Sequence, residues 1–599
     1  MEPFIDAIVS LVDRQLEGLG VDPQPEMREG LVEQPPDAAM GDYAVPCFFL
    51  ARALRKSPPA IAQELAAAIG SRLNGDAQDD YAKDGHGDGL IASVDAAGPY
   101  LNFRVNIARM AGLTIPAILD GSYFQANRDA AGELGQVMVE YSQPNTHKAF
   151  HVGHLRNVAL GDALVRILRY NGNEVVAANY IGDVGTHIAK CLWYYAAHRT
   201  GEPPGGNGHA ARGEWLGELY TAATRLLQEA TAEDRKRYDS EISAVLRQIE
   251  AREGEAFQLW EETRPWSLET FDEIYDWLGA RFDHVFYESE MESGRRIVEQ
   301  GLQRGVFHRS QGAVGVDLEP HGLGFFLVLK ADGTMLYATR DLALAEIKFD
   351  RFQIGRSIYV VGAEQTLHFR QVFKTLELLG YPQAARSTHL PYGLVMLPEG
   401  KMSSRAGNVI LFSRLRAEMR AYISEHYLEA HRGDWSDEEI EETGRRIAVA
   451  AIRYGMVKQD PAKSIVFNME DWLQTEGDTG TYLCYGYTRI CGVRRQVTGE
   501  PRADADFSLL TEQTEKTLIR EMFDFNRVVR QAEAQLRPNL VAGALFQLVK
   551  AFSRTYVTSP VKHAPTPELR DARLALFAAC GRLLGEGLAL LGITPPERM

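Results

Sequence analysis

The chain has 599 residues, of which 45% are hydrophobic and 24% are charged, and it carries a formal net charge of −17 at neutral pH. This composition is that of a globular protein with about three to five domains, and it excludes the disordered, collagen-like and disulfide-scaffold classes. The net negative charge gives no sign of a positively charged surface that would attract a nucleic acid and, taken alone, argues against an RNA partner.

The cysteines and the apolar pattern indicate the compartment. None of the five cysteines belongs to a C-x-x-C pair, which argues against zinc and thioredoxin-type motifs and is typical of a reducing compartment. No apolar run approaches the roughly 18 uncharged residues that span a bilayer. The sequence predicts a soluble, cytoplasmic chain with no membrane partner and no fixed protein metal site.

The first 119 residues predict a small α+β unit. Helical patterns cover residues 4–19 and 58–73, and a strand-like stretch follows at 98–106. A polar linker at 120–135 separates this unit from the rest of the chain.

A strand–helix–strand pattern comes next. A buried-strand pattern at 137–142 precedes a helical pattern at 155–170 and a second strand at 174–183, which is the order of a parallel-sheet unit. A long charged helical region, 214–281, is interpreted as an insertion. Helical periodicity dominates beyond Phe412. Between the two helical regions, sheet-like runs resume at 324–330, 357–365 and 389–397.

The sharpest chemical signal is His151-Val152-Gly153-His154, which lies between the buried strand and the helix. A strand-to-helix turn offers free backbone N–H groups and the positive end of the helix dipole to an anion. Histidines three residues apart project from one face of the first turn, and the glycine allows a flat ring to approach the backbone. The alternative is a pair of histidines that only cap the helix.

A second signal is the polar segment 399–408, EGKMSSRAGN, which follows an apolar strand. At the carboxyl edge of a parallel sheet, where ligands bind, Lys401 and Arg405 can neutralise a polyphosphate. The alternative is a solvated basic loop. The two motifs support each other because both are placed at a sheet edge.

Together the two motifs resemble the HIGH and KMSKS signatures of class I aminoacyl-tRNA synthetases. The segments EYSQPNTHKAFHVGHLRN, NYIGDVGTH, YATRDLALA, GDTGTYLCYGYTRI and LGITPPERM are similar to arginyl-tRNA synthetases, and the resemblance covers nearly the whole chain. It implies an α/β fold with three domains. These are an N-terminal α+β tRNA-contacting domain (1–119), a Rossmann-type parallel-sheet catalytic domain (120–412) with a mainly helical insertion at about 192–305, and a C-terminal all-α helical-bundle, anticodon-binding domain (413–599).

The resemblance also implies an ATP site, with Mg²⁺ carried by the nucleotide. It assigns catalysis to Lys148, His151, His154 and Lys401. Ser404 stands where the second lysine of KMSKS is expected. The resemblance implies that arginine enzymes often carry this lysine just before the HIGH motif instead, where Lys148 stands, so phosphate stabilisation is assigned to Lys148 first and Lys401 second. The candidate ATP-binding residues are His151, Gly153, His154, His368, Lys401, Met402 and Ser403.

An arginine substrate needs carboxylates and acceptors that match its planar guanidinium. By resemblance, five residues bind its α-amino or guanidinium groups: Glu140, Asn145, Tyr337, Asp341 and Gln365. Tyr337 and Asp341 lie four residues apart and so share a helical face. Other roles stay open for three of them: a core aromatic for Tyr337, a helix N-cap for Asp341 and a strand cap for Gln365.

The negative charge is unevenly spread. Residues 451–599 contain 19 Lys and Arg against 17 Asp and Glu, so they carry a net +2 while the first 450 residues carry −19. Arg489 and Arg494 are interleaved with tyrosines on a predicted helix, which suits unstacked RNA bases, although a solvated helix face is the alternative. By resemblance, Tyr100 and Asn102 also contact tRNA.

We therefore predict a monomeric arginine–tRNA ligase. It forms arginyl-adenylate from L-arginine and ATP and transfers the arginyl group to the 3′-terminal adenosine of tRNA(Arg). Two alternatives are a class I paralogue of other amino-acid specificity and a non-catalytic tRNA-binding paralogue.

Overall fold

The computed structural model describes residues 3–21, 32–33, 35, 37, 40–74, 89–129, 135–199, 201–205, 210–331, 333–398, 400–401 and 409–599. Two compact units divide the chain. The first contains residues 1–123, 496–523 and 551–580, and the second contains residues 124–495, 524–550 and 581–599. No helix in the part of the chain described is long and apolar enough to cross a membrane.

The first unit contains a small antiparallel sheet in the order β1-β3-β2. Two helices pack on it, and α1 buries one apolar face that includes Phe4, Ile8 and Leu11. Both helices and strand β3 confirm the elements predicted for this region. The elements are α1 (Pro3–Gly18), β1 (Tyr43–Pro46), η2 (Phe48–Leu50), α2 (Ala51–Leu54), α3 (Pro58–Asn74), β2 (Ile91–Ala97), β3 (Tyr100–Val105) and α5 (Ile107–Asp120). The turn η3 (Ser122–Phe124) spans the boundary of the two units, and α6 (Ala126–Asp129) belongs to the second.

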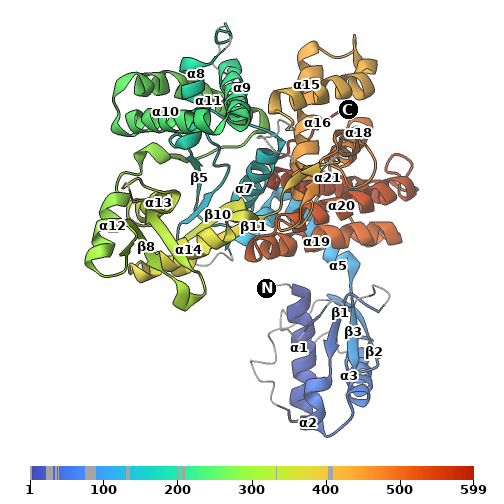
Figure 1. Cartoon of the computed structure of the whole chain (residues 1–599). Helices are drawn as coiled ribbons and strands as arrows, with labels where there is room; N and C mark the ends of the chain where they lie inside the picture. Colours follow the sequence, from blue (N-terminus) through green and yellow to red (C-terminus); the bar gives the residue numbers. More distant parts are fainter. Residues whose placement is uncertain are drawn as a thin grey trace. The chain divides into compact units, whose positions relative to one another are not determined.

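The second unit is built on a five-stranded parallel sheet in the order β11-β10-β4-β5-β6 (Figure 1). Its inner strands are mostly buried apolar runs, as expected for a sheet covered on both faces. The strand order reverses between β4 and β10, so the crevice outside their carboxyl ends is where open α/β sheets bind ligands. The strands are β4 (Val137–Glu140), β5 (Val175–Ile181), β6 (His284–Tyr287), β10 (Arg356–Gly362) and β11 (Ser387–Tyr392).

Helix α7 (Val152–Tyr170) follows β4 and packs against β4, β5 and β10. The parallel pairing of β4 with β5 confirms the predicted strand–helix–strand unit. Two further helices, α13 (Tyr337–Arg351) and α14 (Thr366–Leu378), flank the sheet, with the short turns η6 (Ala363–Gln365) and η7 (Pro382–Arg386) beside them.

Two smaller sheets lie outside the parallel sheet. The first has the order β7-β8-β9 and the second the order β13-β12-β14. The run predicted at 324–330 therefore joins a separate antiparallel sheet, and the run at 389–397 is divided between β11 and β12. Alternation of apolar residues identifies a strand but not its partner. The elements are α12 (Gly294–Gln303), β7 (His308–Ser310), β8 (Ala313–Asp317), η5 (Glu319–His321), β9 (Phe325–Leu329), β12 (Val395–Leu397), β13 (Gly400–Lys401) and β14 (Ile465–Val466).

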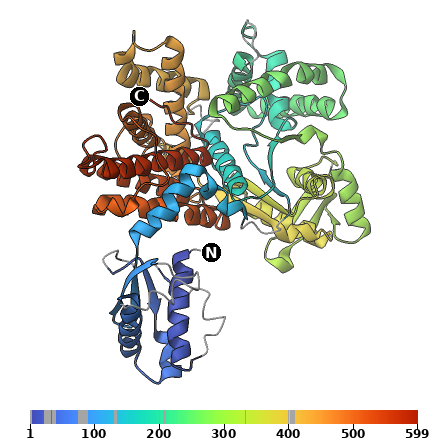
Figure 2. The ribbon, with the colours of Figure 1, turned by 180° about the vertical axis from the view of Figure 1, so that it is seen from behind.

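Four helices of the predicted insertion gather into one bundle, which both views of the ribbon show (Figures 1 and 2). They are α8 (Thr186–Ala197), α9 (Ala210–Glu229), α10 (Ala232–Ala251) and α11 (Gly254–Leu278). The range predicted for the insertion, 192–305, also contains β6, which pairs with β5 and completes the five-stranded parallel sheet. This strand was missed because its four residues lie within the range that was assigned to the helical insertion.

Beyond residue 412 the chain is helical apart from β14, as predicted. All five cysteines are free thiols, and four of them are buried, which fits their use as small apolar residues. The elements are α15 (Phe412–Ile423), η8 (Ser424–Leu428), η9 (Glu429–His431), α16 (Asp437–Val457), α17 (Met469–Leu473), α18 (Gly480–Gln496), η10 (Phe507–Leu509), α19 (Gln513–Ala534), α20 (Asn539–Thr558) and α21 (Pro567–Leu590).

Candidate active site

His151 and His154 are held in the first turn of α7. His151 is the N-cap, and its Nδ1 accepts a hydrogen bond from the Gly153 N–H at 3.1 Å, while the His154 Nδ1 accepts one from the His151 N–H at 3.1 Å. Because each Nδ1 is an acceptor, the proton of each neutral ring lies on Nε2. The start of the helix therefore carries two Nε2–H donors.

Burial keeps both rings neutral. It lowers the pKa of His151 to about 4, and the Lys148 ammonium acts in the same direction. Burial also lowers the pKa of His154 well below its usual value, with smaller effects from His151 and Lys148. The two interpretations left open by the sequence are thus compatible, because the rings cap the helix through Nδ1 and keep Nε2 for a ligand.

The loop between β4 and α7 is held in an unusual backbone conformation. Ser142, Gln143 and His147 have φ angles of 76°, 47° and 59°, which cost on the order of 1–3 kcal/mol each in non-glycine residues. Tertiary contacts hold the loop: the Ser142 N–H donates to Asn157 Oδ1 at 2.8 Å, and His147 Nε2 lies 2.8 Å from Thr263 Oγ1. Strain of this kind is typical of preorganised functional segments.

A cavity of about 530 Å³ lies at this turn, which is within the usual size of a small-molecule site. Asn145, Lys148, His151 and His154 line it together with residues of α9. The Lys148 Nζ lies 5.2 Å from the centre of the Tyr220 ring, within cation–π range. The structure thus brings four predicted site residues to one cavity.

The segment after the second motif returns to this cavity. The Val152 N–H donates to the Ile410 carbonyl at 3.0 Å, so this segment lies beside the start of α7. Lys401 lies on β13, which pairs with β12. The other residues predicted in this motif lie outside the described residues: Met402, Ser403, Ser404 and Arg405.

Tyr337 and Asp341 lie on α13, at its first residue and in its second turn. Leu336 is the N-cap of this helix, so Asp341 is not. Tyr337 is 57% exposed, which excludes a core role. The Asp341 carboxylate lies 2.5 Å from His368 Nε2, so a histidine predicted to bind ATP is paired with a carboxylate predicted to bind arginine.

Glu140 is buried at the carboxyl end of β4, and both of its oxygens have protein partners. It forms an ion pair with buried Lys348 and accepts a hydrogen bond from Gln143 Nε2 at 3.0 Å. Lys348 in turn lies 3.9 Å from the centre of the Tyr359 ring. Gln365 is exposed and ends η6, one turn beyond the strand it was expected to end.

Glu288 is a buried carboxylate near Asn145 that the sequence analysis missed. It begins η4 (Glu288–Glu290), directly after β6. Its Oε1 accepts a hydrogen bond from Arg340 Nη1 at 2.7 Å, while its Oε2 has no hydrogen-bond partner among the described residues. A Cβ at Gly182 would lie 2.4 Å from Asn145 Oδ1 and 3.5 Å from Glu288 Oε2. The sequence signal for Glu288 was its position at the carboxyl end of a strand. The sequence analysis could not use this signal because it did not predict β6.

The surroundings of Glu288 are acidic. Burial raises its pKa to about 7; Arg340 opposes this shift, and Asp341 and Asp183 add to it. Asp183 fixes the η4 turn, because its carboxylate accepts from the Ser289 N–H at 2.8 Å. A buried carboxylate oxygen with no partner, near a second carboxylate, is suited to a cation with hydrogen-bond donors.

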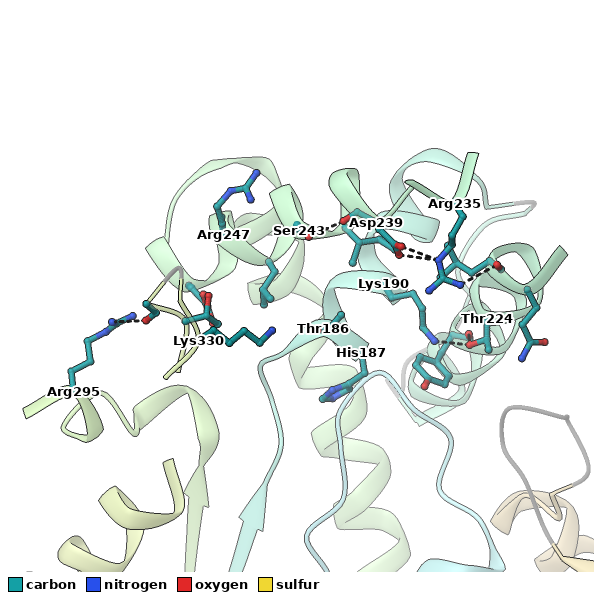
Figure 3. Close-up of a pocket in the computed structure, with 18 residues that line it drawn as sticks. Thr186, His187, Lys190, Thr224, Arg235, Asp239, Ser243, Arg247, Arg295 and Lys330 are labelled. Atoms are coloured by element: carbon teal, nitrogen blue, oxygen red, sulfur yellow. Dashed lines mark hydrogen bonds and ion pairs between the residues drawn. The ribbon is translucent and has the colours of Figure 1, made fainter. Parts of the chain in front are cut away.

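A second cavity of about 900 Å³ lies between the insertion helices and the loop after β9 (Figure 3). Lys190 donates to Thr224 Oγ1 at 2.6 Å and Arg235 pairs with Asp239 at 3.0 Å. Tyr220 lines both cavities, which makes them neighbours. Five basic side chains line the second cavity: Lys190, Arg235, Arg247, Arg295 and Lys330.

The predicted tRNA contacts lie in different elements. In β3 of the first unit, Asn102 is buried and Tyr100 packs edge-on against Phe48 at 5.9 Å. In α18, Arg494 is exposed in the last turn, and the Arg489 guanidinium lies 5.7 Å from the centre of the Tyr485 ring.

Three family models match the chain. They are described as "Arginyl tRNA synthetase N terminal domain" (residues 6–105), "tRNA synthetases class I (R), catalytic domain" (residues 115–469) and "DALR anticodon binding domain" (residues 483–599). The parallel sheet, the His151–His154 turn at its switch point and the match over residues 115–469 define a class I aminoacyl-tRNA synthetase.

Similar proteins narrow this assignment. The arginine–tRNA ligase of Bdellovibrio bacteriovorus is 41% identical over 94% of this chain and 93% of its own, and that of Clostridioides difficile is 33% identical over the whole of both chains. The solved arginyl-tRNA synthetase of Thermus thermophilus matches with a TM-score of 0.73 and 28% identity over 99% of each chain. The chain belongs to the arginyl-tRNA synthetase family, and its activity is that of an arginine–tRNA ligase.

Proposed function

We propose that this chain activates L-arginine with ATP to arginyl-adenylate, releases pyrophosphate, and transfers the arginyl group to the 3′-terminal adenosine of tRNA(Arg). The observation that carries this proposal is the α7 turn, in which two neutral imidazoles held through Nδ1 stand beside Lys148 on the cavity wall. Catalysis of this chemistry rests on positioning and on preorganised donors that meet developing charge.

In the first step the carboxylate of arginine attacks the α-phosphate of ATP and pyrophosphate leaves. We assign the Nε2–H groups of His151 and His154 and the Lys148 ammonium to the phosphates, with Lys401 second to Lys148. Mg²⁺ would enter with ATP. Among the described residues no three metal-ligating side chains form a group that could hold a metal ion.

For the arginine substrate we propose a pocket formed by Asn145, Glu288, Tyr337 and Asp341, with Gln365 at its rim. Glu140 is given a supporting role, because Lys348 and Gln143 already occupy its two oxygens. A lysine side chain lacks the planar fork and would leave buried acceptors unpaired, a mismatch that can give about 10⁴-fold discrimination.

For tRNA we propose that the single-stranded 3′ end enters through the basic cavity of Figure 3, since its five cations suit a sugar-phosphate backbone. Its shared wall at Tyr220 supports delivery of the terminal adenosine to the first cavity. Arg489 and Arg494 are proposed to contact anticodon-loop bases. Tyr100 is proposed to contact the tRNA body, and Asn102 to support it from the interior of the sheet.

The remaining parts of the proposal concern organisation. We infer an N-terminal tRNA-contacting domain (1–119), a catalytic domain (120–412, with its insertion) and a helical anticodon-binding domain (413–599) in a cytoplasmic monomer. The near-neutral charge of residues 451–599, against −19 for the rest, supports RNA binding by the helical domain.

ATP–pyrophosphate exchange and tRNA charging, measured with each amino acid and with or without tRNA, test the proposal. We expect arginine alone to support both reactions. Preference for another amino acid would point to a synthetase of different specificity. Binding of tRNA without exchange or charging would point to the non-catalytic alternative.

A further inference from the structure

Arg340 is a buried arginine inside the candidate arginine pocket. It lies on α13 between Tyr337 and Asp341 and is 6% exposed. Its Nη1 donates to Glu288 Oε1 at 2.7 Å, and its Nη2 lies 3.4 Å from an oxygen of Glu250. One guanidinium thus joins the turn after β6 to helix α10 of the insertion.

This contact leaves one side of the Glu288 carboxylate available. Arg340 occupies Oε1, while Oε2 has no hydrogen-bond partner among the described residues and points toward Gly182 and Asn145. A buried carboxylate oxygen without a partner costs free energy until a donor arrives. A carboxylate held by one oxygen is a preorganised acceptor at the other.

We propose that Arg340 is a positioning residue for recognition of the substrate guanidinium: it holds Glu288 by one oxygen and so aims the other at the substrate. This inference rests on the proposed function. Arg340 does not contact the reacting atoms in this scheme. Through Glu250, which lines the second cavity, it also ties the pocket to the insertion.

The charges around Glu288 set the expected pH dependence. Burial raises the pKa of Glu288 to about 7 even with Arg340 in place, so removing that cation raises the pKa further. A protonated Glu288 is a poor partner for a guanidinium, and the KM for arginine therefore rises as pH falls through the pKa. Besides Arg340, the titratable groups that interact electrostatically with Glu288 are Asp183, Asp341, Tyr180 and Tyr337.

The experiment measures tRNA charging by the full chain at saturating ATP and tRNA. The arginine concentration is varied at each pH between 6 and 9, so that KM and kcat are obtained as functions of pH. We expect Arg340→Gln to raise the KM for arginine about tenfold or more at pH 7.5, with kcat within about threefold of wild type. We expect the pH at which KM begins to rise to move up by about one unit. Arg296→Gln removes the ion pair between half-exposed Arg296 on α12 and buried Glu346 on α13, and it serves as the matched control because it also leaves a buried carboxylate without its arginine partner.

Arg340→Gln leaves the buried Glu288 charge without its partner and could therefore impair folding. Two more variants separate such a folding defect from the proposed positioning role. Arg340→Lys keeps a cation and is expected to recover part of the lost affinity. The double variant Glu288→Gln with Arg340→Gln removes both charges, and its KM is expected to be high and independent of pH between 6 and 8.

Two outcomes would overturn the inference, and a third would overturn the proposed function. An unchanged KM and pH profile in Arg340→Gln would overturn the inference. A lower KM would also overturn it, because Arg340 would then be competing with substrate for the same carboxylate. If the wild-type chain did not attach arginine to tRNA, the proposed function would be wrong, whatever the variants showed.

Discussion

Two substitutions of His151 separate its two ring nitrogens. The Nδ1 atom caps α7 by accepting from the Gly153 N–H at 3.1 Å, and Nε2 carries the proton proposed to meet the phosphates. In His151→Asn the side-chain oxygen falls close to the Nδ1 position and preserves the cap. In His151→Gln the amide nitrogen falls close to the Nε2 position and preserves the donor.

The two losses differ in size. A helix cap contributes about 0.5–2 kcal/mol, whereas one preorganised donor contributes about 2.7–4 kcal/mol to the transition state, or roughly 10²–10³ in rate. We therefore expect His151→Asn to lower kcat about 10²–10³-fold with little change in thermal unfolding. We expect His151→Gln to lower the unfolding midpoint by about 2 °C and kcat by less than about tenfold.

The assay is ATP–pyrophosphate exchange with arginine and tRNA present, alongside thermal unfolding of the same samples. His151→Ala, which loses both functions, provides the reference. If His151→Asn kept near-normal exchange while His151→Gln lost it, the cap rather than the Nε2–H would carry the role of His151, and the assignment of this ring to the phosphates would be refuted.

Three further outcomes are expected. Lys148→Ala lowers kcat for exchange roughly 10²–10³-fold, by loss of one preorganised cation; near-normal exchange would remove Lys148 from the mechanism. Gly182→Ala raises the KM for arginine, since a Cβ there would lie 2.4 Å from Asn145 Oδ1, and an unchanged KM would place Asn145 outside the pocket. His147 is buried, and burial lowers its pKa to about 3, so the unfolded state alone binds this proton between pH 6.5 and 3. Stability thus falls as pH drops through this window, and the unfolding midpoint of His147→Gln should depend less on pH than that of wild type; equal dependence would contradict this account.

The start of α7 illustrates how far local sequence patterns reach. The pattern predicted a helix from residue 155, whereas the helix begins at Val152. The difference arises because an imidazole is not among the usual capping side chains, which are Ser, Thr, Asp and Asn. The chemical content of the motif was nevertheless predictable, since two histidines, a glycine and a helix start are all local features.

The proposed arginine pocket shows which features local sequence patterns cannot predict. Glu140 and Lys348 are 208 residues apart, and only the packing of α13 against the sheet brings them into the ion pair that occupies Glu140. Conversely, Glu288 was not a candidate until β6 was found to pair with β5. Charge and spacing could identify carboxylates but not which of them lacks a partner.

The amino-acid sequence by itself determined helices α1, α3 and α7, the helical character of the insertion and of the chain beyond residue 412, and strands β3, β4, β5, β9 and β10. It also determined the turn at His151 that is proposed to bind phosphate and the uneven charge along the chain, because periodicity, capping and composition act over a few neighbouring residues. Tertiary structure alone decided the strand order, the separation of the two small sheets, and the contrast between Glu140, paired with Lys348, and Glu288, with one oxygen open. Those properties depend on contacts between segments far apart in the chain, whose partners are chosen by the packing of the whole unit.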